Sequence, residues 1–233
     1  MAAEDHNQAM KRRHFAFTFS LSAGFGLAGG AHAVSQADAG AGARAALERG
    51  AVAAVALLGK NDGFLGNPKV RIPLPGYLAD AAKLLKAIGQ GKKVDELVTA
   101  MNRAAELAVP EAKQLLVAAA RDISVGDALA IVRGGDNSVT QFFAEKTRAP
   151  LGVKFLPIVT KATEKVSLAE RYNAVAAKAT NMGLVKKEDA NIQLYITGKA
   201  LDGMYFIIGE EEKKIRADPI GTGSKILQAV FGR

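Results

Sequence analysis

The sequence predicts an all-α protein, a single-domain multi-helix bundle built around a long helix in the C-terminal half, with one Pro/Gly-rich loop. Apolar residues recur at three- and four-residue spacing in most segments. The 233-residue chain is 49% hydrophobic and 23% charged, which is typical of an ordinary globular domain. No periodic repeat and no low-complexity linker interrupts residues 34–233, so we expect them to form one helical domain.

Residues 1–33 have the order of segments that a secretory signal peptide requires. Lys11, Arg12 and Arg13 precede an apolar stretch, and a small-residue stretch ending in Ala31-His32-Ala33 follows. We therefore expect cleavage after Ala33 and a periplasmic location. Arg12-Arg13-His14-Phe15 also resembles the twin-arginine export motif, so that route and the general secretory route both stay open.

The residue types that are absent after this leader exclude several chemistries. His6, His14 and His32 all lie in the leader, and the chain has no cysteine. Without imidazole or thiol, Ser-His-Asp and Cys-His catalysis are excluded in their usual forms, because nothing takes the nucleophile's proton near neutral pH. Zinc, copper and haem sites normally need the same ligands, so we expect no metal and no cofactor. A binding protein is therefore expected more than an enzyme.

The charge balance is moderately basic. Removing the leader takes away three basic and two acidic residues from a formal charge of +8, which leaves +7. Basic and acidic residues are interleaved along most segments, which favours a solvated surface over a nucleic-acid stripe. Peripheral contact with anionic lipid headgroups or cell-wall polymers stays open. After the leader the longest apolar run is Ala51–Leu58, so we expect no transmembrane segment.

The first predicted helix is followed by the Pro/Gly-rich loop. Ser35 and Asp38 fit a capping pair, and the alanine-rich run 41–58 continues the helix until Gly59 ends it. Three prolines and several turn formers exclude a helix over residues 61–76, although Val70–Ile72 could form a short extended piece. The loop carries apolar residues to the bundle, either as a plug in the core or as a lid over a pocket: Phe64, Leu65, Ile72 and Leu74.

The next segments have helical spacing and recognisable ends. We expect helices over residues 77–88, 94–107 and 110–120. Ser124 with Asp127 forms another capping box, and Gly134-Gly135 closes the short helix that follows. Residues 138–166 are predicted helical with breaks near Pro150 and Pro157.

The C-terminal third supplies the predicted central helix. Ser167 with Glu170 caps a helix that ends near Gly183, and residues 188–217 form the long helix, followed by a last short helix over 224–231. The first half of the long helix is almost wholly apolar and its second half almost wholly charged. The spacing of Glu210 from Lys214, and of Glu212 from Arg216, predicts exposed ion pairs along that second half.

Five segments occur in a fixed order along the chain: N-D-G-F at 61–64, R-I-P-L-P at 71–75, M-N-R-A-A-E at 101–106, K-A-L-D-G at 199–203 and E-E-E-K-K-I-R-A-D-P at 210–219. Together they resemble the bacterial domain-of-unknown-function family 4197, over about residues 35–232. The resemblance implies an exported, mostly helical protein from a Gram-negative bacterium. It implies no activity and no catalytic residues.

One candidate catalytic group lies on two predicted helices. Lys199 and Asp202 are three residues apart in the most apolar part of the long helix, so we expect them to pair with each other or with Arg103 and Glu106. The structural interpretation is an ion network. The functional interpretation places Asp202, Glu106 and Lys199 in one cleft as acid, base and electrostatic partner.

One candidate anion site precedes the last helix. Gly221-Thr222-Gly223-Ser224-Lys225 could hold a phosphate or carboxylate through Thr222, Gly223, Ser224 and Lys225, with Arg216 nearby in the sequence. Ordinary capping of the helix by Ser224 explains the same residues.

Three functional hypotheses follow. The first is an exported periplasmic protein that binds a lipid or a small apolar or amphipathic ligand, or an envelope partner, because the chain combines an apolar loop with few catalytic side chains. The second is a carboxylate-dependent hydrolase or lyase of a cell-wall glycan. The third is a structural envelope protein without catalytic activity.

Overall fold

The computed structural model describes residues 35–164, 169–170, 172–173, 181 and 191–232. The chain divides into two units, Met1–Ala33 and Val34–Arg233, and all of these residues belong to the second. The described part contains helices and no strand, which confirms the predicted all-α fold. Its elements are α1 (Gln36–Leu58), α2 (Gly76–Ala87), α3 (Gly91–Ala108), the short 3₁₀ helix η1 (Val109–Glu111), α4 (Ala112–Arg121), α5 (Val125–Arg133), α6 (Ser138–Thr163), α8 (Ile192–Ala217) and α9 (Lys225–Phe231).

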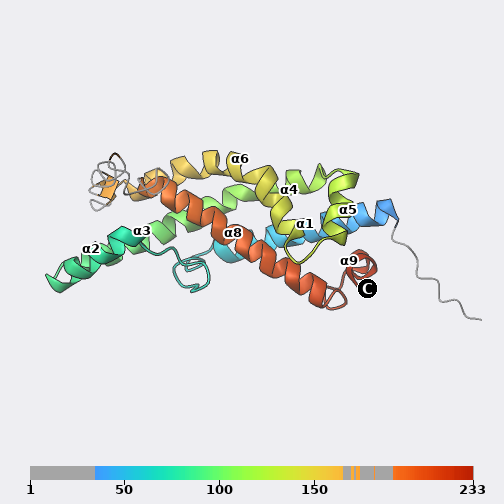
Figure 1. Ribbon diagram of the computed structural model, residues 1–233, viewed down its shortest axis with the longest axis horizontal. Helices are drawn as coiled ribbons and strands as arrows, with labels where there is room; N and C mark the ends of the chain where they lie inside the picture. Colours follow the sequence, from blue (N-terminus) through green and yellow to red (C-terminus); the bar gives the residue numbers. More distant parts are fainter. Residues whose placement is uncertain (1–34, 165–168, 171, 174–180, 182–190, 233) are drawn as a thin grey trace, which may run out of the picture. The chain divides into compact units, whose positions relative to one another are not determined.

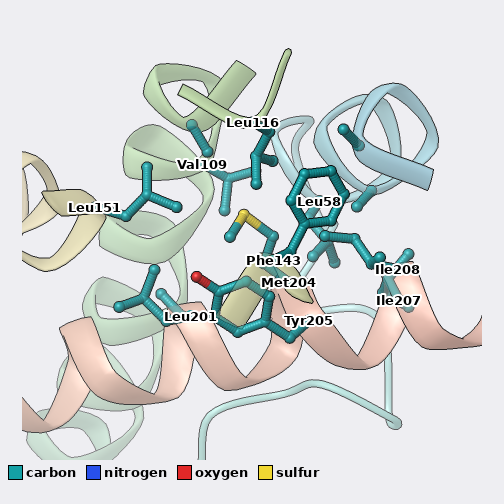
Figure 2. Packing of buried hydrophobic residues seen from close by; sticks show 14 of the residues in the cluster. Leu58, Val109, Leu116, Phe143, Leu151, Leu201, Met204, Tyr205, Ile207 and Ile208 are labelled. Carbon is teal, nitrogen blue, oxygen red and sulfur yellow. The ribbon is translucent and has the colours of Figure 1, made fainter. Parts of the chain in front are cut away.

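Two long helices hold the core together. As predicted, α8 is central: it packs along α6 and α1 and also contacts α3 and α9 (Figure 1). Helix α1 is equally central, because α4, α5 and α9 pack on it as well as α8. Leu58, Phe143, Met204 and Ile208, from α1, α6 and α8, meet in the interior (Figure 2). Burying each such side chain contributes about 1.5–3 kcal/mol to folding.

The N-terminus of α1 confirms the predicted capping pair. The Ser35 side chain accepts a hydrogen bond from the Asp38 backbone N–H at 3.0 Å, and its hydroxyl donates to the Asp38 carboxylate at 2.6 Å. Further along, α1 presents small residues to its neighbours. A Cβ added at Gly42 would lie 2.6–2.9 Å from three side-chain carbons of Val230 in α9, so the absence of a side chain there lets α9 approach.

We expect Gly42→Ala to destabilise the protein by about 1–3 kcal/mol, because the new methyl group overpacks the contact with Val230. The cost should be smaller in a Val230→Ala background, which removes two of the three crowded carbons. Gly152→Ala in α6 is the matched control, since nothing lies within 4 Å of a Cβ added there and alanine favours helix. Urea unfolding of the single and double variants measures the coupling. Equal costs of Gly42→Ala in both backgrounds would contradict this account.

Helix α6 corrects one prediction, because it runs unbroken from Ser138 to Thr163 through Pro150 and Pro157. Both prolines are exposed. The backbone carbonyls that lose their helical donors there can therefore bond to water. Every fourth residue of the helix is buried: Phe143, Thr147, Leu151, Phe155, Val159 and Thr163. Packing of this continuous stripe against the core keeps the helix intact. The two prolines, judged from the sequence alone, predicted breaks.

The observed start of the long helix differs from the predicted one. The long helix begins at Ile192 and not at residue 188, because Asn191 is extended and its side chain accepts hydrogen bonds from the N–H groups of Gln193 and Leu194. An asparagine in this position starts the helix. The capping pair predicted at Ser167 and Glu170, with the helix ending near Gly183, falls largely outside the described residues.

Residues 61–75 form the expected irregular loop between α1 and α2. Its side chains decide between the two interpretations, because Phe64 is 0% and Ile72 1% exposed and both belong to the core. The loop is therefore a plug. The short extended piece predicted at Val70–Ile72 does not form, since Val70 lies in a turn and Ile72 pairs with a side chain.

Candidate functional site

Three residues on neighbouring turns of α3 hold this loop, and we call Asn102, Arg103 and Glu106 the loop clamp. Glu106 is 4% exposed, and its Oε1 accepts hydrogen bonds from the N–H groups of Phe64 and Leu65, both at 3.0 Å. Its Oε2 accepts from Arg103 Nη1 at 2.6 Å. That bond raises the pKa of the Arg103 guanidinium. A buried carboxylate satisfied in this way fixes the first turn of the loop.

Asn102 fixes the second half of the loop. It is fully buried, its Oδ1 accepts from the Ile72 N–H at 2.8 Å, and its Nδ2 donates to the Ile72 carbonyl at 3.0 Å. One side chain thus meets both backbone groups of Ile72, as a neighbouring strand would. The Tyr195 hydroxyl of α8 donates to the Pro73 carbonyl at 3.1 Å. These contacts fix the backbone on both sides of Ile72.

The fixed loop segment forms one wall of an open groove whose other walls are α2 and α3. The groove has a volume of about 390 Å³. Its apolar surface comes from Leu74 of the loop, Ala82 of α2, and Val94 and Val98 of α3. An apolar surface with a few polar groups at its edge is typical of ligand sites.

The charged groups of the groove are mostly basic. Arg71, Lys83 and Lys86 line it, with Asp95 as the acidic residue among them. Lys86 pairs with Asp95 at 3.1 Å. Arg71 donates a long hydrogen bond of 3.4 Å to the Leu65 carbonyl, a neutral acceptor, so its charge is not neutralised by that contact. Among the described residues, the groove therefore joins an apolar surface to charged groups that are mostly basic.

The three residues proposed as a catalytic group lie in two sets of contacts. Asp202 of α8 accepts a hydrogen bond from Arg148 of α6 and lies 3.8 Å from Lys199 Nζ, as the predicted pairing of those two residues requires. Glu106 belongs to the loop clamp, and no contact in the described part of the chain joins it to Asp202 or Lys199. Asp202 and Arg148 line an open hollow of about 280 Å³ between α6 and α8. The structure thus does not bring the three side chains together.

Tyr205 lies beside Asp202 in that hollow and is 5% exposed. Its hydroxyl lies 2.9 Å from Thr147 Oγ1 of α6, and the Arg148 guanidinium lies 5.7 Å from the centre of its ring. Burial raises the pKa of the Tyr205 hydroxyl. A neutral phenol in this setting binds α6 to α8 and is not suited to act as a base near neutral pH.

The residues of the predicted anion site also lie in two separate sets of contacts. Arg216 donates to Glu212, to the Ser138 hydroxyl at 2.7 Å and to the Ile131 carbonyl at 2.8 Å, and its guanidinium lies 5.0 Å from the centre of the Phe231 ring. These partners lie on α5, α6, α8 and α9. The Arg216 guanidinium thus contacts residues of these helices and not the turn at residues 222–224.

The turn before α9 has its own partners. The Thr222 carbonyl accepts from Arg49 of α1 at 2.9 Å, and Thr222 Oγ1 accepts from the Ser224 N–H at 3.2 Å. Gly223 has a φ of 69°, which favours glycine. The Ser224 side chain makes no capping hydrogen bond, so the predicted side-chain cap is wrong, and Lys225 is the first residue of α9. These contacts bind the turn to α1.

Sequence reasoning missed the role of Glu212. This carboxylate is 3% exposed and accepts hydrogen bonds from the N–H groups of Val139 and Thr140, at 3.1 and 3.2 Å, so it caps the N-terminus of α6. The predicted pair with Arg216 forms, but inside the protein and not on an exposed face. Helical spacing could have predicted the burial of Glu212, because this residue lies between Ile208 and Ile215 on the buried side of α8.

The exposed charges of α8 also pair differently from the prediction. Glu210 pairs with Lys69 of the loop at 3.1 Å and with Lys213 at 3.4 Å. Lys214 pairs with Glu211, so the predicted pair of Glu210 with Lys214 does not form. The hydrogen bond and charge of Lys69 lower the pKa of Glu210. The Glu210 carboxylate thus pairs with Lys69 of the loop, a contact that helical spacing cannot predict.

A further open hollow lies at the α5–α6 junction. It has a volume of about 430 Å³, and Asp127, Asp136 and Glu145 line it. Asp127 already accepts a hydrogen bond from Ser124 at 2.8 Å. Among the described residues, no cluster of three or more acidic, histidine or cysteine side chains could hold a metal ion. No helix in the described ranges combines the length and apolarity that a membrane span needs.

Comparison with known proteins shows the family. A family model described as "Protein of unknown function (DUF4197)" matches residues 33–232, which is nearly the whole chain. No curated protein and no solved structure matches. The five segments that carry the resemblance lie within the matched range, and the chain belongs to the DUF4197 family.

Proposed function

We propose that this member of the DUF4197 family is an exported binding protein of the bacterial envelope, and that it holds an amphipathic anion in the groove formed by α2, α3 and the loop. The observation that carries the proposal is the composition of the groove. Leu74, Val94 and Val98 supply apolar surface, and Arg71 and Lys83 lie beside it. An acyl chain fits the first and a phosphate or carboxylate fits the second.

Two observations support export. Residues 1–33 have the order of a signal peptide, with Lys11, Arg12 and Arg13 before the apolar stretch and Ala33 at the end. The family match begins at residue 33, and the second unit of the chain begins at Val34. Cleavage after Ala33 therefore leaves the matched region almost whole. We propose a periplasmic location on these grounds.

The geometry favours binding over catalysis in the groove. Asp95 is its acidic lining residue, and Lys86 already pairs with that carboxylate. Hydrolysis of a glycan needs two carboxyl groups on either side of the scissile bond. Among the described residues the groove offers one carboxylate, so the glycan hydrolase hypothesis gains no support from them.

The first test is native mass spectrometry of the protein recovered from the periplasmic fraction. We expect an intact mass that begins at Val34 and a second species that carries a bound acyl lipid. Protein found in the cytoplasm with residues 1–33 attached would contradict export. Periplasmic protein with a bare mass under gentle conditions would contradict the ligand.

The second test uses a defined probe, lysophosphatidylglycerol below its micelle concentration. Arg71→Gln should weaken its binding about tenfold in calorimetry, because a charge-assisted hydrogen bond contributes about 1.5 kcal/mol or more. Lys60→Gln is the matched control: it removes the same charge from an exposed residue that is not among the groove residues. Lysophosphatidylcholine, whose headgroup has no net charge, should bind both variants alike. Equal affinity of the two variants for the anionic probe would contradict this site.

A further inference from the structure

The turn between α2 and α3 projects an apolar residue into solvent. Helix α2 ends at Ala87, and a turn follows in which Gly89 has a φ of 81° and its N–H donates to the Lys86 carbonyl at 3.2 Å. Helix α3 begins at Gly91. The helices therefore reverse direction within a few residues, and we call residues 86–93 the hairpin tip.

Ile88 is 72% exposed at this tip, although isoleucine is among the residues most often found in protein cores. Its neighbour Ala87 is exposed as well. A single exposed aliphatic side chain needs no special account. The position matters here, because lysines lie within a few residues of it on both sides: Lys86 before it, and Lys92 and Lys93 after it.

The charge around Ile88 has one sign. Residues 86–93 contain three lysines and no acidic residue. Lys92 and Lys93 are exposed, and neither forms an ion pair with another described residue. Lys86 pairs with Asp95, which is itself 70% exposed and lies beyond the tip in α3. The tip therefore presents uncompensated positive charge around an apolar centre.

We propose that the hairpin tip docks on the surface of an anionic phospholipid bilayer. Lys92 and Lys93 contact lipid phosphates, and Ile88 enters the layer between headgroups and acyl chains. A bilayer surface satisfies both features at once, since it offers negative charge and an apolar layer a few ångströms below it. A soluble polyanion would satisfy the lysines and leave Ile88 in water. The three residues that contact the bilayer do not line the groove, so docking does not depend on ligand binding there.

The absence of tryptophan makes the proposal directly measurable. The substitution Ile88→Trp places the sole indole of the chain at the tip. The experiment uses the full protein as the cell produces it. The fluorescence emission of the indole should shift to the blue when phosphatidylglycerol vesicles are added. It should stay unchanged with phosphatidylcholine vesicles. Val153→Trp gives the control reporter, because Val153 is 77% exposed on α6 and away from the tip sequence. The emission of the control variant should not shift with either vesicle.

Charge variants separate docking from general attraction. Lys92→Gln with Lys93→Gln should weaken co-sedimentation of the otherwise unchanged protein with phosphatidylglycerol vesicles about 30-fold, because each lysine near an anionic surface contributes about fivefold. Lys146→Gln with Lys154→Gln removes the same charge from exposed positions on α6. This control pair should change binding less than about threefold.

Three results would overturn the proposal. They are an equal loss of binding in the two charge variants, a blue shift in the Val153→Trp protein that matches that of the Ile88→Trp protein, and binding of heparin with no binding to phosphatidylglycerol vesicles. Ligand binding in the groove is tested separately, by calorimetry with lysophosphatidylglycerol and the Arg71→Gln variant, so its failure would not affect this proposal.

Discussion

Replacement of Glu212 by alanine is expected to lower the free energy of unfolding by about 3–5 kcal/mol, because removal of one partner leaves a buried charge uncompensated. The partner is Arg216, whose side chain is 15% exposed. The same change removes the acceptor for the N–H groups of Val139 and Thr140 at the start of α6. Asn137, which precedes the first residue of that helix, makes no side-chain capping bond that could replace it.

The neighbouring residue provides the control. Glu211→Ala removes the same number of atoms and the same charge one position away, but Glu211 pairs with Lys214, whose side chain is 71% exposed. We expect this control to cost less than about 1 kcal/mol. Glu212→Gln should fall between the two, since an amide keeps one acceptor for the α6 backbone. Urea unfolding followed by circular dichroism measures all three. A Glu212→Ala cost no larger than that of Glu211→Ala would show that the buried network adds no stability.

Local signals in the sequence were sufficient for most of the fold. Ser35 and Ser124 cap their helices as predicted, since a capping box is complete within four residues. Gly59 and Gly89 end helices for the same local reason. The long helix was recognisable because its apolar half is continuous. Helix type and approximate bounds depend on neighbours in the sequence, so they could be predicted.

Contacts between distant segments could not be predicted in this way. Glu210, Glu211 and Glu212 are identical in type and adjacent, yet only Glu212 is buried, because α6 begins beside it. Val139 lies 73 residues before Glu212 in the chain, so helical spacing cannot predict their contact. The prolines of α6 show the reverse case, where local chemistry predicted breaks and packing against the core overrode it.

The candidate groove was predictable only in part. Leu74 was expected to meet the bundle, and it packs against the core. The position of Arg71 beside apolar surface was not expected, because it depends on how Asn102 fixes the loop. That of Lys83 depends on how α2 packs on α3. Sequence reasoning identified the loop as apolar but could not show which polar side chains held it.

The loop clamp explains why several segments of the family resemblance occur together. Asp62 pairs with Arg103, the Phe64 N–H bonds to Glu106, and Ile72 bonds to Asn102. A Cβ added at Gly203 would lie 2.8 Å from the Phe64 ring, so this glycine makes room for the plug. Segments 61–64, 71–75, 101–106 and 199–203 thus meet in one contact region. Their shared task is to position the loop, and with it one wall of the groove.

Glu106→Ala should therefore release the loop, with an expected loss of about 2–4 kcal/mol in the free energy of unfolding, because two backbone N–H groups lose their acceptor. The variant leaves the Phe64 and Leu65 N–H groups without their acceptor and frees Arg103 from its buried partner. Hydrogen exchange locates the effect. We expect the Phe64 and Leu65 amides to lose protection first, because local opening of the loop then costs less than unfolding of α6 and α8.

Glu96→Ala on the same helix is the control for Glu106→Ala, since Glu96 is exposed, and it should change stability by less than about 0.5 kcal/mol. Asn102→Ala should release the Ile72 amide in the same experiment, because Asn102 Oδ1 is its acceptor. If loop and helix amides lost protection equally in Glu106→Ala, the clamp would serve the whole fold and not the loop. If the loop amides stayed protected, burial of Phe64 and Ile72 alone would be sufficient to hold the loop, and the groove wall would not depend on the clamp.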